Sequence, residues 1–178
     1  MSTLHVENLK GLSSGGNANK VIIPTGQTLE VTDNIRYDDM PVGSVIQTVD
    51  SSSTAVVTTS SSGTWVNSGD TITITPKFAT SKLHILVYAA GETYGWSNQG
   101  TGYRILNGST AVYDNEYSNY NSNSNTQRID KVVLLHIESA ASTSARTYTL
   151  QVRVRGNGSA RHNQYGEPSR LVIMEIAQ

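Results

Sequence analysis

The sequence predicts an all-β protein, built as a ten-strand jelly-roll sandwich, and three observations lead to that expectation. Charged residues make up only 15% of the chain, while small polar residues are abundant. From Gly43 onward, short runs rich in Val, Ile, Thr and Tyr follow one another, separated by Gly, Asn, Ser and Pro. No stretch shows the 3.6-residue apolar period of an amphipathic helix. Many short strands with turn-rich punctuation are typical of a sandwich or jelly roll.

Residues 1–42 differ from the rest, and we expect them to form a short extended docking or stalk segment. The stretch LKGLSSGGNANK is rich in Gly, Ser and Asn, and Pro24 and Gly26 interrupt the apolar run VIIPTGQTLEV that follows. Met40 stands before Pro41, and a proline biases its predecessor toward extended geometry. Such a segment has too few apolar residues for its own core, so it needs a partner surface. The head domain is expected to span residues 43–178.

The strands of residues 43–178 can be placed from their apolar pattern. Arg146–Arg155 and Thr71–Thr75 alternate cleanly between apolar and polar residues, which predicts strands with one wet face. The Asn-Gly step after Leu106 predicts a tight hairpin, because this pair tolerates positive φ. The ten expected strands are Ser44–Val49, Ala55–Thr59, Thr64–Val66, Thr71–Thr75, Leu83–Ala90, Tyr103–Leu106, Ala111–Tyr113, Ile129–Glu138, Ala145–Arg155 and Arg170–Ile176.

Three of the expected strands contain stretches that are apolar on both faces: Leu83–Ala90, Lys131–Glu138 and Leu171–Ile176. A sandwich sheet normally buries only its inner face, and no helix is expected to cover the outer one. Simple exposure of these side chains is the alternative. We expect instead self-association through the second face, closed as a ring by symmetry. The expected interface residues are Ile46, His84, Leu86, Tyr88, His136, Val172, Met174 and Ile176.

The connections between the strands alternate between short and long. Successive connections of an antiparallel sandwich alternate between its ends, so the long ones should share one end, and the chain should enter at the other. The long connections are expected at Gly91–Gly102, Asp114–Gln127 and Gly156–Pro168, and the short ones at Thr75–Ser81, Asn107–Ser109 and Ser139–Ala145.

The long connections are rich in Tyr, Trp and Asn, which predicts a binding surface. Aromatic rings stack on sugars while amides bind hydroxyl groups, and the same residues suit protein contacts. The alternative is that each ring packs on its own loop and orders it. The candidate ligand-binding residues are Tyr94, Trp96, Tyr117, Tyr120, Asn121, His162 and Tyr165.

The bulk composition argues against several classes of function. The formal net charge is −1, so no nucleic-acid partner is expected. The chain has no cysteine, which excludes a disulfide framework and a thiolate metal site. No apolar run approaches a membrane span, so no membrane partner is expected. The opening MSTLHVENLK lacks the apolar core of a signal peptide, so we expect synthesis in the cytosol.

Catalytic chemistry is not expected either. None of the four histidines has a His, Asp or Glu at a metal-ligand spacing, so we expect no metal site. Three symmetry-related histidines around a trimer axis could still bind a metal ion or an anion, and this is the one such site left open. No nucleophile elbow, phosphate-binding loop or dinucleotide fingerprint is present. Asp114 and Glu116 are the carboxylates considered for glycan hydrolysis, and no supporting group accompanies them. We therefore expect a protein that is not an enzyme and has no cofactor.

Several stretches resemble proteins of tailed bacteriophages, especially marine ones. They are MSTLHVENLK, VIIPTGQTLEV, MPVGSVIQTV, TITITPKFATSKLHILVYA, RILNGSTAV and LVIMEIA. In addition, GSVIQTV, KLHILVYAA, RIDKVVLLHIE and RLVIMEIA resemble the inner-sheet strands of the trimeric tumour-necrosis-factor/complement-type head, which pack around a threefold axis. The resemblance implies a homotrimeric tail-fibre or appendage protein on the virion, docked to other virion proteins through residues 1–42. The expected stalk is much shorter than that of a long tail fibre, which leaves a head-surface decoration or a short spike open.

Two main functions remain open at this point. In the first, the distal loops of the trimer bind a host-surface receptor, either a glycan or a protein. In the second, the chain is a capsid or tail decoration protein, a cement, with no receptor-binding role. A depolymerase is the third and least favoured reading, because no site chemistry supports it.

Overall fold

The computed structural model describes residues 13–16, 18, 21–28, 40–95, 98–122 and 126–178. The chain divides into two units, Met1–Asp38 and Asp39–Gln178. In the first unit, the described residues include two hydrogen-bonded turns, in which Ala18 donates to the Gly15 carbonyl and Gln27 to that of Pro24. The apolar run that begins at Val21 is exposed. The docking role expected of residues 1–42 stays a prediction.

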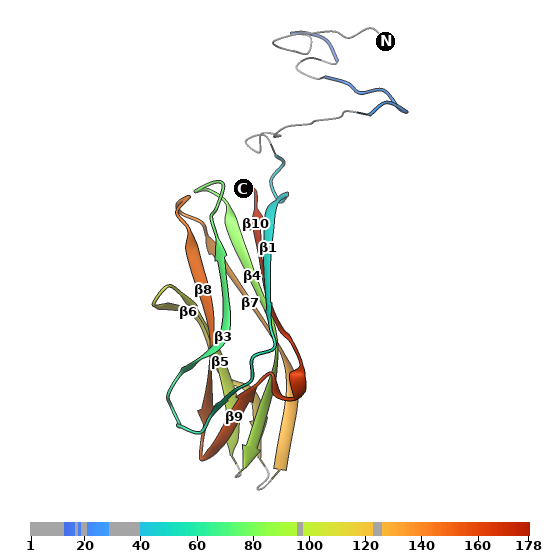
Figure 1. The fold of residues 1–178 in the computed structure, drawn as a ribbon. Coiled ribbons are helices and arrows are strands. Elements are labelled where there is room, and N and C mark those ends of the chain that lie inside the picture. The colour runs from blue at the N-terminus through green and yellow to red at the C-terminus, as the bar shows by residue number, and fades with distance from the viewer. Residues whose placement is uncertain (1–12, 17, 19–20, 29–39, 96–97, 123–125) are drawn as a thin grey trace. The chain divides into compact units, whose positions relative to one another are not determined.

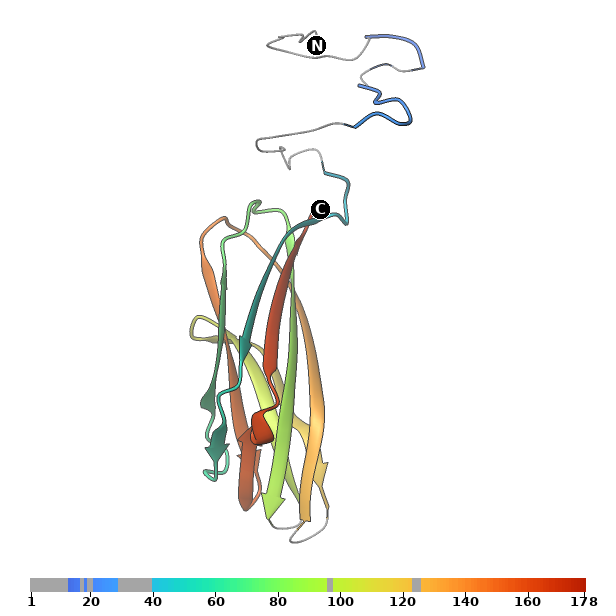
Figure 2. The same ribbon diagram turned by 45° about the vertical axis from the view of Figure 1, so that its right-hand side comes forward.

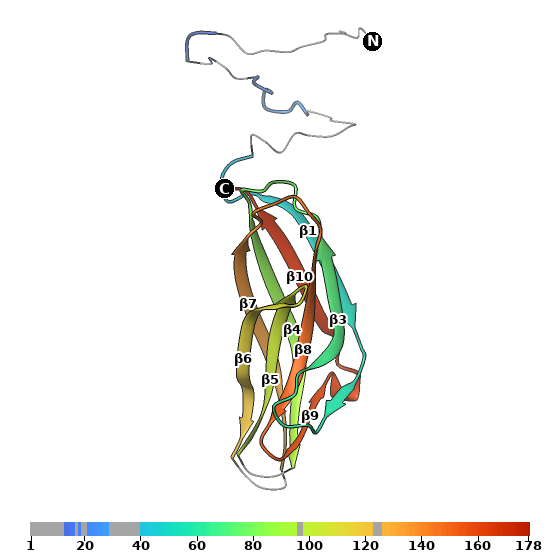
Figure 3. The same cartoon turned by 90° about the vertical axis from the view of Figure 1, so that its left-hand side faces the viewer.

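The second unit is an all-β sandwich of two antiparallel sheets (Figure 1). Sheet A has the order β1-β10-β4-β9-β2, with β7 on the other edge of β4, and sheet B has the order β3-β8-β5-β6. Figure 3 looks onto sheet B. The strands are β1 (Val45–Ser53), β2 (Val57–Thr59), β3 (Val66–Ile74), β4 (Lys82–Gly95), β5 (Gln99–Asn107), β6 (Thr110–Asn121), β7 (Thr126–Ser139), β8 (Arg146–Arg155), β9 (Gly158–His162) and β10 (Ser169–Ile176), with one 3-10 turn, η1 (Gln164–Gly166).

The strand order confirms the predicted jelly-roll class. The four strands expected to share one sheet are β1, β4, β7 and β10, and all four lie in sheet A (Figure 2). β1 pairs antiparallel with β10, from Val45 opposite Ile176 to Ser53 opposite Ser169. The head therefore begins and ends on neighbouring strands.

The set of strands differs from the prediction at two places, where two expected strands merge and one unexpected strand forms. The segments expected as Thr64–Val66 and Thr71–Thr75 belong to one strand, β3, whose register with β8 shifts between Asn67 and Thr71. β9 lies inside the long loop expected at Gly156–Pro168. Its sequence GSARH contains a single aliphatic residue, so no apolar alternation marks it as a strand. β9 forms because it can pair with both β2 and β4.

The other two long loops, expected at Gly91–Gly102 and Asp114–Gln127, are wrong, because most of their residues belong to strands. β4 extends to Gly95 and β5 starts at Gln99, while β6 extends to Asn121 and β7 starts at Thr126. The strand ends nevertheless gather at one end of the sandwich, which we call the distal end. Pairing places Gly95 opposite both Thr126 and Gly158, and Gln99 opposite Asn121. The prediction that these connections share an end is therefore confirmed.

The opposite end, which we call the entry end, receives the chain at β1. Gly43 donates its backbone N–H to Ala177, and Ala177 donates to Ser44, so both ends of the head domain meet there. The short connections after β3 and β7 lie at the same end, because Lys82 pairs with both Ile176 and Ser139. This arrangement agrees with the expected point of entry.

An apolar core fills the space between the sheets. From Lys82 to Tyr88, β4 alternates, with Leu83, Ile85 and Val87 buried and the residues between them on the outer face. The remaining large aliphatic and aromatic members of the core are Ile72, Ile74, Tyr103, Ile105, Val132, Leu134, Tyr148, Leu150, Val152, Val154, Leu171 and Ile173. Full burial of such side chains contributes about 1.5–3 kcal/mol each, which makes this core the main stabilising term.

Glu175 is a buried carboxylate that holds the connection between β3 and β4. It accepts hydrogen bonds from the backbone N–H groups of Lys77 (2.9 Å) and Phe78 (3.0 Å), from Ser81 Oγ (2.6 Å) and from Gln47 Nε2 (2.6 Å). Burial alone raises the pKa of a carboxyl group, but these donors outweigh it and lower the pKa of Glu175 below its ordinary value.

We expect Glu175→Gln to destabilise the head by about 2–4 kcal/mol, because several donors lose their charged acceptor. Urea denaturation at neutral pH measures this. Since the folded pKa is lowered, the carboxylate contribution is fully present above the ordinary value of 4.5 and is lost as pH falls through the folded value. The wild type should therefore lose more stability in acid than the variant. Glu167→Gln, at an exposed ion pair, serves as the control and should change little. Identical acid profiles for wild type and Glu175→Gln would refute this role.

Candidate functional site

The outer face of sheet A carries a continuous apolar surface, which we call the apolar face. Cross-strand pairing sets its side chains in rows, so that Val172, Leu86 and Leu135 form one row across β10, β4 and β7. On the edge strand β7, Val133, Leu135 and Ile137 are 64%, 54% and 46% exposed. The apolar face comprises Leu86, Tyr88, Val133, Leu135, Ile137, Val172, Met174 and Ile176, with His84 between Met174 and Ile137.

The outer face of sheet B is different in character. Thr71 and Thr73 on β3, and Thr147 and Thr149 on β8, alternate with buried apolar residues. The predicted wet face of these strands is thus confirmed. One sheet of the sandwich presents polar groups to water, and the other presents large aliphatic side chains.

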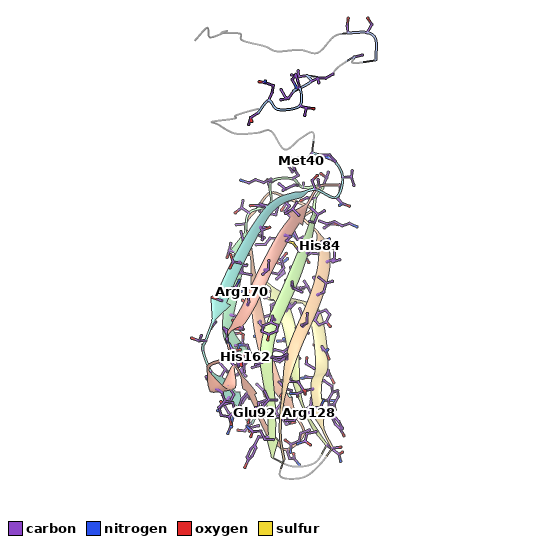
Figure 4. The ribbon with its side chains drawn as sticks, turned by 90° about the vertical axis from the view of Figure 1, so that its right-hand side faces the viewer. Met40, His84, Glu92, Arg128, His162 and Arg170 are labelled. Carbon is purple, nitrogen blue, oxygen red and sulfur yellow. The ribbon has the colours of Figure 1, made fainter. Side chains whose placement is uncertain are left out.

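Six of the eight predicted interface residues lie on the apolar face: His84, Leu86, Tyr88, Val172, Met174 and Ile176. Figure 4 looks onto this sheet and labels His84 on it. The sequence missed the β7 members, because a strand that is apolar throughout gives no sign of which residues face outward.

Two predicted interface residues are wrong. Ile46 is only 7% exposed at the irregular start of the β1–β10 pairing, so it is already buried within one chain. His136 shares the inward parity of Val132 and Leu134, and its Nε2 lies 3.4 Å from Glu138 on the same strand. Neither side chain is presented on the outer face of sheet A.

The interior of the distal half is polar, and Asp70 is at its centre. Asp70 accepts hydrogen bonds from Ser68 (2.8 Å) and Ser169 (2.5 Å), and His162 Nε2 lies 2.6 Å from its carboxylate. His162 Nδ1 is 3.1 Å from the Tyr103 hydroxyl. Burial raises the pKa of Tyr103. Burial alone would raise the pKa of Asp70. The hydrogen bonds from His162, Ser169 and Ser68 outweigh burial, so the net effect is a pKa below the ordinary value of a carboxyl group.

These contacts correct two candidate binding residues. His162 is fully buried in β9, so it cannot meet a ligand at the surface. Asn121 is 5% exposed and belongs to the same interior. Both lie in segments that read as loops because their inward positions are polar, and His162 meets Asp70 and Tyr103 inside the sandwich. Trp96 lies outside the described residues.

Four of the predicted aromatic residues are exposed at the surface of the distal half: Tyr94, Tyr117, Tyr120 and Tyr165. Tyr165, in η1, is the most exposed at 67%. The structure thus brings the predicted tyrosines to one half of the head but divides them between the two sheets.

On sheet A, a buried carboxylate organises the surface around Tyr94 and Tyr165. Glu92 accepts hydrogen bonds from Arg161 (3.1 Å) and Gln127 (2.9 Å), and Gln127 also donates to the Tyr165 hydroxyl (2.8 Å). The Arg161 guanidinium lies 5.5 Å from the Tyr94 ring centre. Sequence reasoning missed Glu92 and Gln127, because no apolar alternation extends past Ala90 to mark Glu92 as part of a strand. Figure 4 labels Glu92 and His162 in this half.

On sheet B, the tyrosines pack on the protein itself. Tyr117 and Tyr120 meet edge to face at 5.7 Å, and the Tyr120 hydroxyl donates to Asn98 (2.7 Å). A Cβ on Gly100 would lie 2.6 Å from the Tyr117 ring, so this glycine lets the ring rest on the β5 backbone. The alternative that aromatic residues order their own segment applies to this pair.

We expect Gly158→Ala to disturb the distal end. The added Cβ would lie 1.7 Å from the buried Gln99 amide oxygen and 2.6 Å from the Tyr94 carbonyl, and a backbone carbonyl cannot move away cheaply. The expected loss is about 1–3 kcal/mol of unfolding free energy, measured by urea denaturation. Gly16→Ala, where the added Cβ meets nothing within 4 Å, is the matched control. A Gly158→Ala variant as stable as the control would contradict the close packing around Gln99.

The described residues contain no group of three or more His, Asp or Glu that could hold a metal ion. They also contain no helix long and apolar enough to cross a lipid bilayer.

No family model matches the sequence, and no curated protein matches it. Among solved structures, a chain from the structure of infectious bursal disease virus, Gx strain, is similar to this chain, with a TM-score of 0.40 and 14% sequence identity. The match covers 88% of this chain and 45% of that chain. The VP2 subviral particle of the same virus gives a TM-score of 0.41 and 16% identity, over 88% and 46%. The chain spans less than half the length of these solved chains. Similarity at this level says nothing about what the present chain binds or assembles with.

Proposed function

We propose that the chain is a virion structural protein that assembles as a homotrimer through the apolar face of sheet A. The observation that carries the proposal is the contrast between the two sheets: one outer face is polar, while the other exposes Val133, Leu135 and Ile137 beside Leu86 and Met174. Exposed apolar surface of this kind marks an interaction site in a soluble protein. Burying each such side chain on assembly contributes up to about 1.5–3 kcal/mol.

Two arguments support threefold self-association over other partners. A surface repeated on identical chains closes most simply as a symmetric ring. In addition, the apolar face lies on β4, β7 and β10, three of the four strands whose sequences resemble the inner sheet of trimeric tumour-necrosis-factor/complement-type heads. The virion setting rests on the phage-like stretches of the sequence.

The distal end is proposed to bind a host-surface glycan or protein. Tyr94 and Tyr165 are exposed beside Arg161, whose guanidinium has further N–H donors besides the one it gives to Glu92, and this combination suits sugar hydroxyls as well as polar protein surfaces. The head receives the chain at the entry end, so the distal end is remote from the attachment of residues 1–42, which are proposed to dock on other virion proteins. A trimer would present three such sites, and simultaneous binding of several weak sites gives much tighter adsorption to the host surface than one site alone.

A decoration or cement role is the alternative, and one observation favours it. Tyr117 and Tyr120 are already engaged with each other and with Asn98, so only part of the predicted aromatic surface offers free ring faces. In that role, the distal end would contact neighbouring subunits of the particle instead of a receptor.

The assembly proposal predicts that Leu86→Glu yields a monomer, because three buried carboxylates would face one another in the ring. Light scattering coupled to size-exclusion chromatography measures the mass directly, and the wild type should have three times the mass of one chain. Thr73→Glu places the same charge on the polar face of sheet B and should leave the trimer intact. A Leu86→Glu variant that stays trimeric would show that another surface joins the chains, and a monomeric wild type would refute the assembly.

The receptor proposal predicts that purified wild-type protein competes with intact particles for adsorption to host cells. The double variant Tyr94→Ala/Tyr165→Ala should compete at least about tenfold more weakly, since stacking on each ring contributes on the order of 1 kcal/mol. Its trimer mass should be unchanged. If wild-type protein does not compete at all, and electron cryomicroscopy of the particle shows the distal end buried against other subunits, the decoration role is correct instead.

A further inference from the structure

The outer face of sheet B carries a row of stacked aromatic and arginine side chains, which we call the stripe: Trp65, Arg104, Arg153, Arg155 and Tyr117. It crosses three strands that Figure 3 shows side by side, β8, β5 and β6, with Trp65 just before β3. The guanidinium carbons of Arg104 and Arg153 lie 4.7 and 4.4 Å from the Trp65 ring centre, and that of Arg155 lies 5.5 Å from the Tyr117 ring. None of these contacts belongs to the apolar face or to the Tyr94 surface.

Trp65 is held against the outer face of sheet B by its contacts with Arg104 and Arg153. Arg153 points to the outer face, where side chains are normally wet, yet it is only 7% exposed. The indole 4.4 Å away therefore covers it, and cation–π attraction holds the ring in place. Trp65 itself remains partly exposed. A large flat ring fixed on an open sheet is a stacking platform that needs no further ordering when a ligand arrives.

The charge along the stripe is not balanced. Glu116 forms ion pairs with Arg153 and, at 3.1 Å, with Arg155, so one carboxylate serves two guanidinium groups. Arg104 forms no ion pair with any described residue, and its Nε donates to Gln151 Oε1 (2.7 Å). This hydrogen bond orients the guanidinium beside Trp65, and no other residue in the described part of the chain accepts from its remaining N–H donors, which are available for a ligand.

We propose that the stripe binds an acidic saccharide, one that carries carboxylate or sulfate groups. A sugar ring stacks on Trp65, and its anionic group pairs with Arg104, whose forked donors match a planar carboxylate. Asn67 accepts a hydrogen bond from Gln151 (2.6 Å), the residue that also binds Arg104. The Asn67 amide can therefore bind hydroxyl groups of the same sugar. The site shares no residue with the receptor surface proposed around Tyr94 and Tyr165, so the two proposals can be tested independently.

Charge and shape favour a saccharide over other macromolecules. A protein interface has a fully buried apolar centre, whereas this face offers threonines, amides and guanidinium groups around two rings. A nucleic acid needs a longer unbroken basic track, and here Glu116 interrupts the arginines. Anionic sugars need one cation beside one ring, which is what Trp65 and Arg104 supply.

Titration calorimetry with polygalacturonate (carboxylate), dextran sulfate (sulfate) and dextran (neutral) tests the site on the protein of residues 1–178. We expect binding to at least one acidic polymer, weakening as salt is added, and none to dextran. The polymer that binds more tightly identifies the anionic group. Arg104→Gln should bind about tenfold more weakly, the loss expected for one charge-assisted pair. Trp65→Phe, which keeps a smaller ring, should also bind more weakly.

Lys77→Gln is the matched control, because it removes one exposed positive charge at the entry end, and it should bind like the wild type. Melting temperatures confirm that each variant is folded, and Tyr94→Ala/Tyr165→Ala should keep full affinity. The proposal is overturned if neither acidic polymer binds, if dextran binds equally well, or if Arg104→Gln and Lys77→Gln behave alike. Equally tight binding of polydeoxythymidylate would also overturn it, because the stripe would then respond to negative charge alone.

Discussion

The pairing of β4 is the constraint on which the rest of the head depends. One edge of this strand pairs first with β10 and then with β9, and the other edge pairs with β7 along its whole length. Slipping the register by one residue would move Leu83, Ile85 and Val87 out of the core and Leu86 into it. The same register therefore sets the core, the rows of the apolar face and the position of Glu92 at the distal end.

The two outer faces of the sandwich have separate physical characters, and this separation lets one small domain carry several proposed contacts. The apolar face of sheet A can bury hydrophobic area against copies of the chain, while sheet B stays in water and offers rings and guanidinium groups. The distal half differs again, because hydrogen bonds around Asp70 replace apolar packing in its interior. Such a network costs stability if any member is unpaired, but it holds the neighbouring surface in one arrangement.

Sequence patterns predicted the architecture well where the physical signal was apolar. The jelly-roll class, the four strands of sheet A and most of the apolar face follow from alternation and from strands that are apolar on both sides. The distal half was not predictable in the same way: His162 and Asn121 occupy inward positions, yet they are polar, so their strands read as binding loops. His136 was misplaced because both faces of its strand are apolar. Contacts such as Trp65 on Arg104 join distant segments, which periodicity cannot reveal.

The place of β10 in sheet A has a consequence for how the head is made. β10 is the last strand in the sequence, but it lies between β1 and β4. Until residues 169–176 have left the ribosome, β1 has no neighbour in its sheet and β4 has an open edge from Lys82 to Tyr88. The head therefore cannot complete its fold before its last strand has been made. It must close afterwards through contacts between the two ends of the domain, a slow, non-local step in which unpaired strand edges favour aggregation.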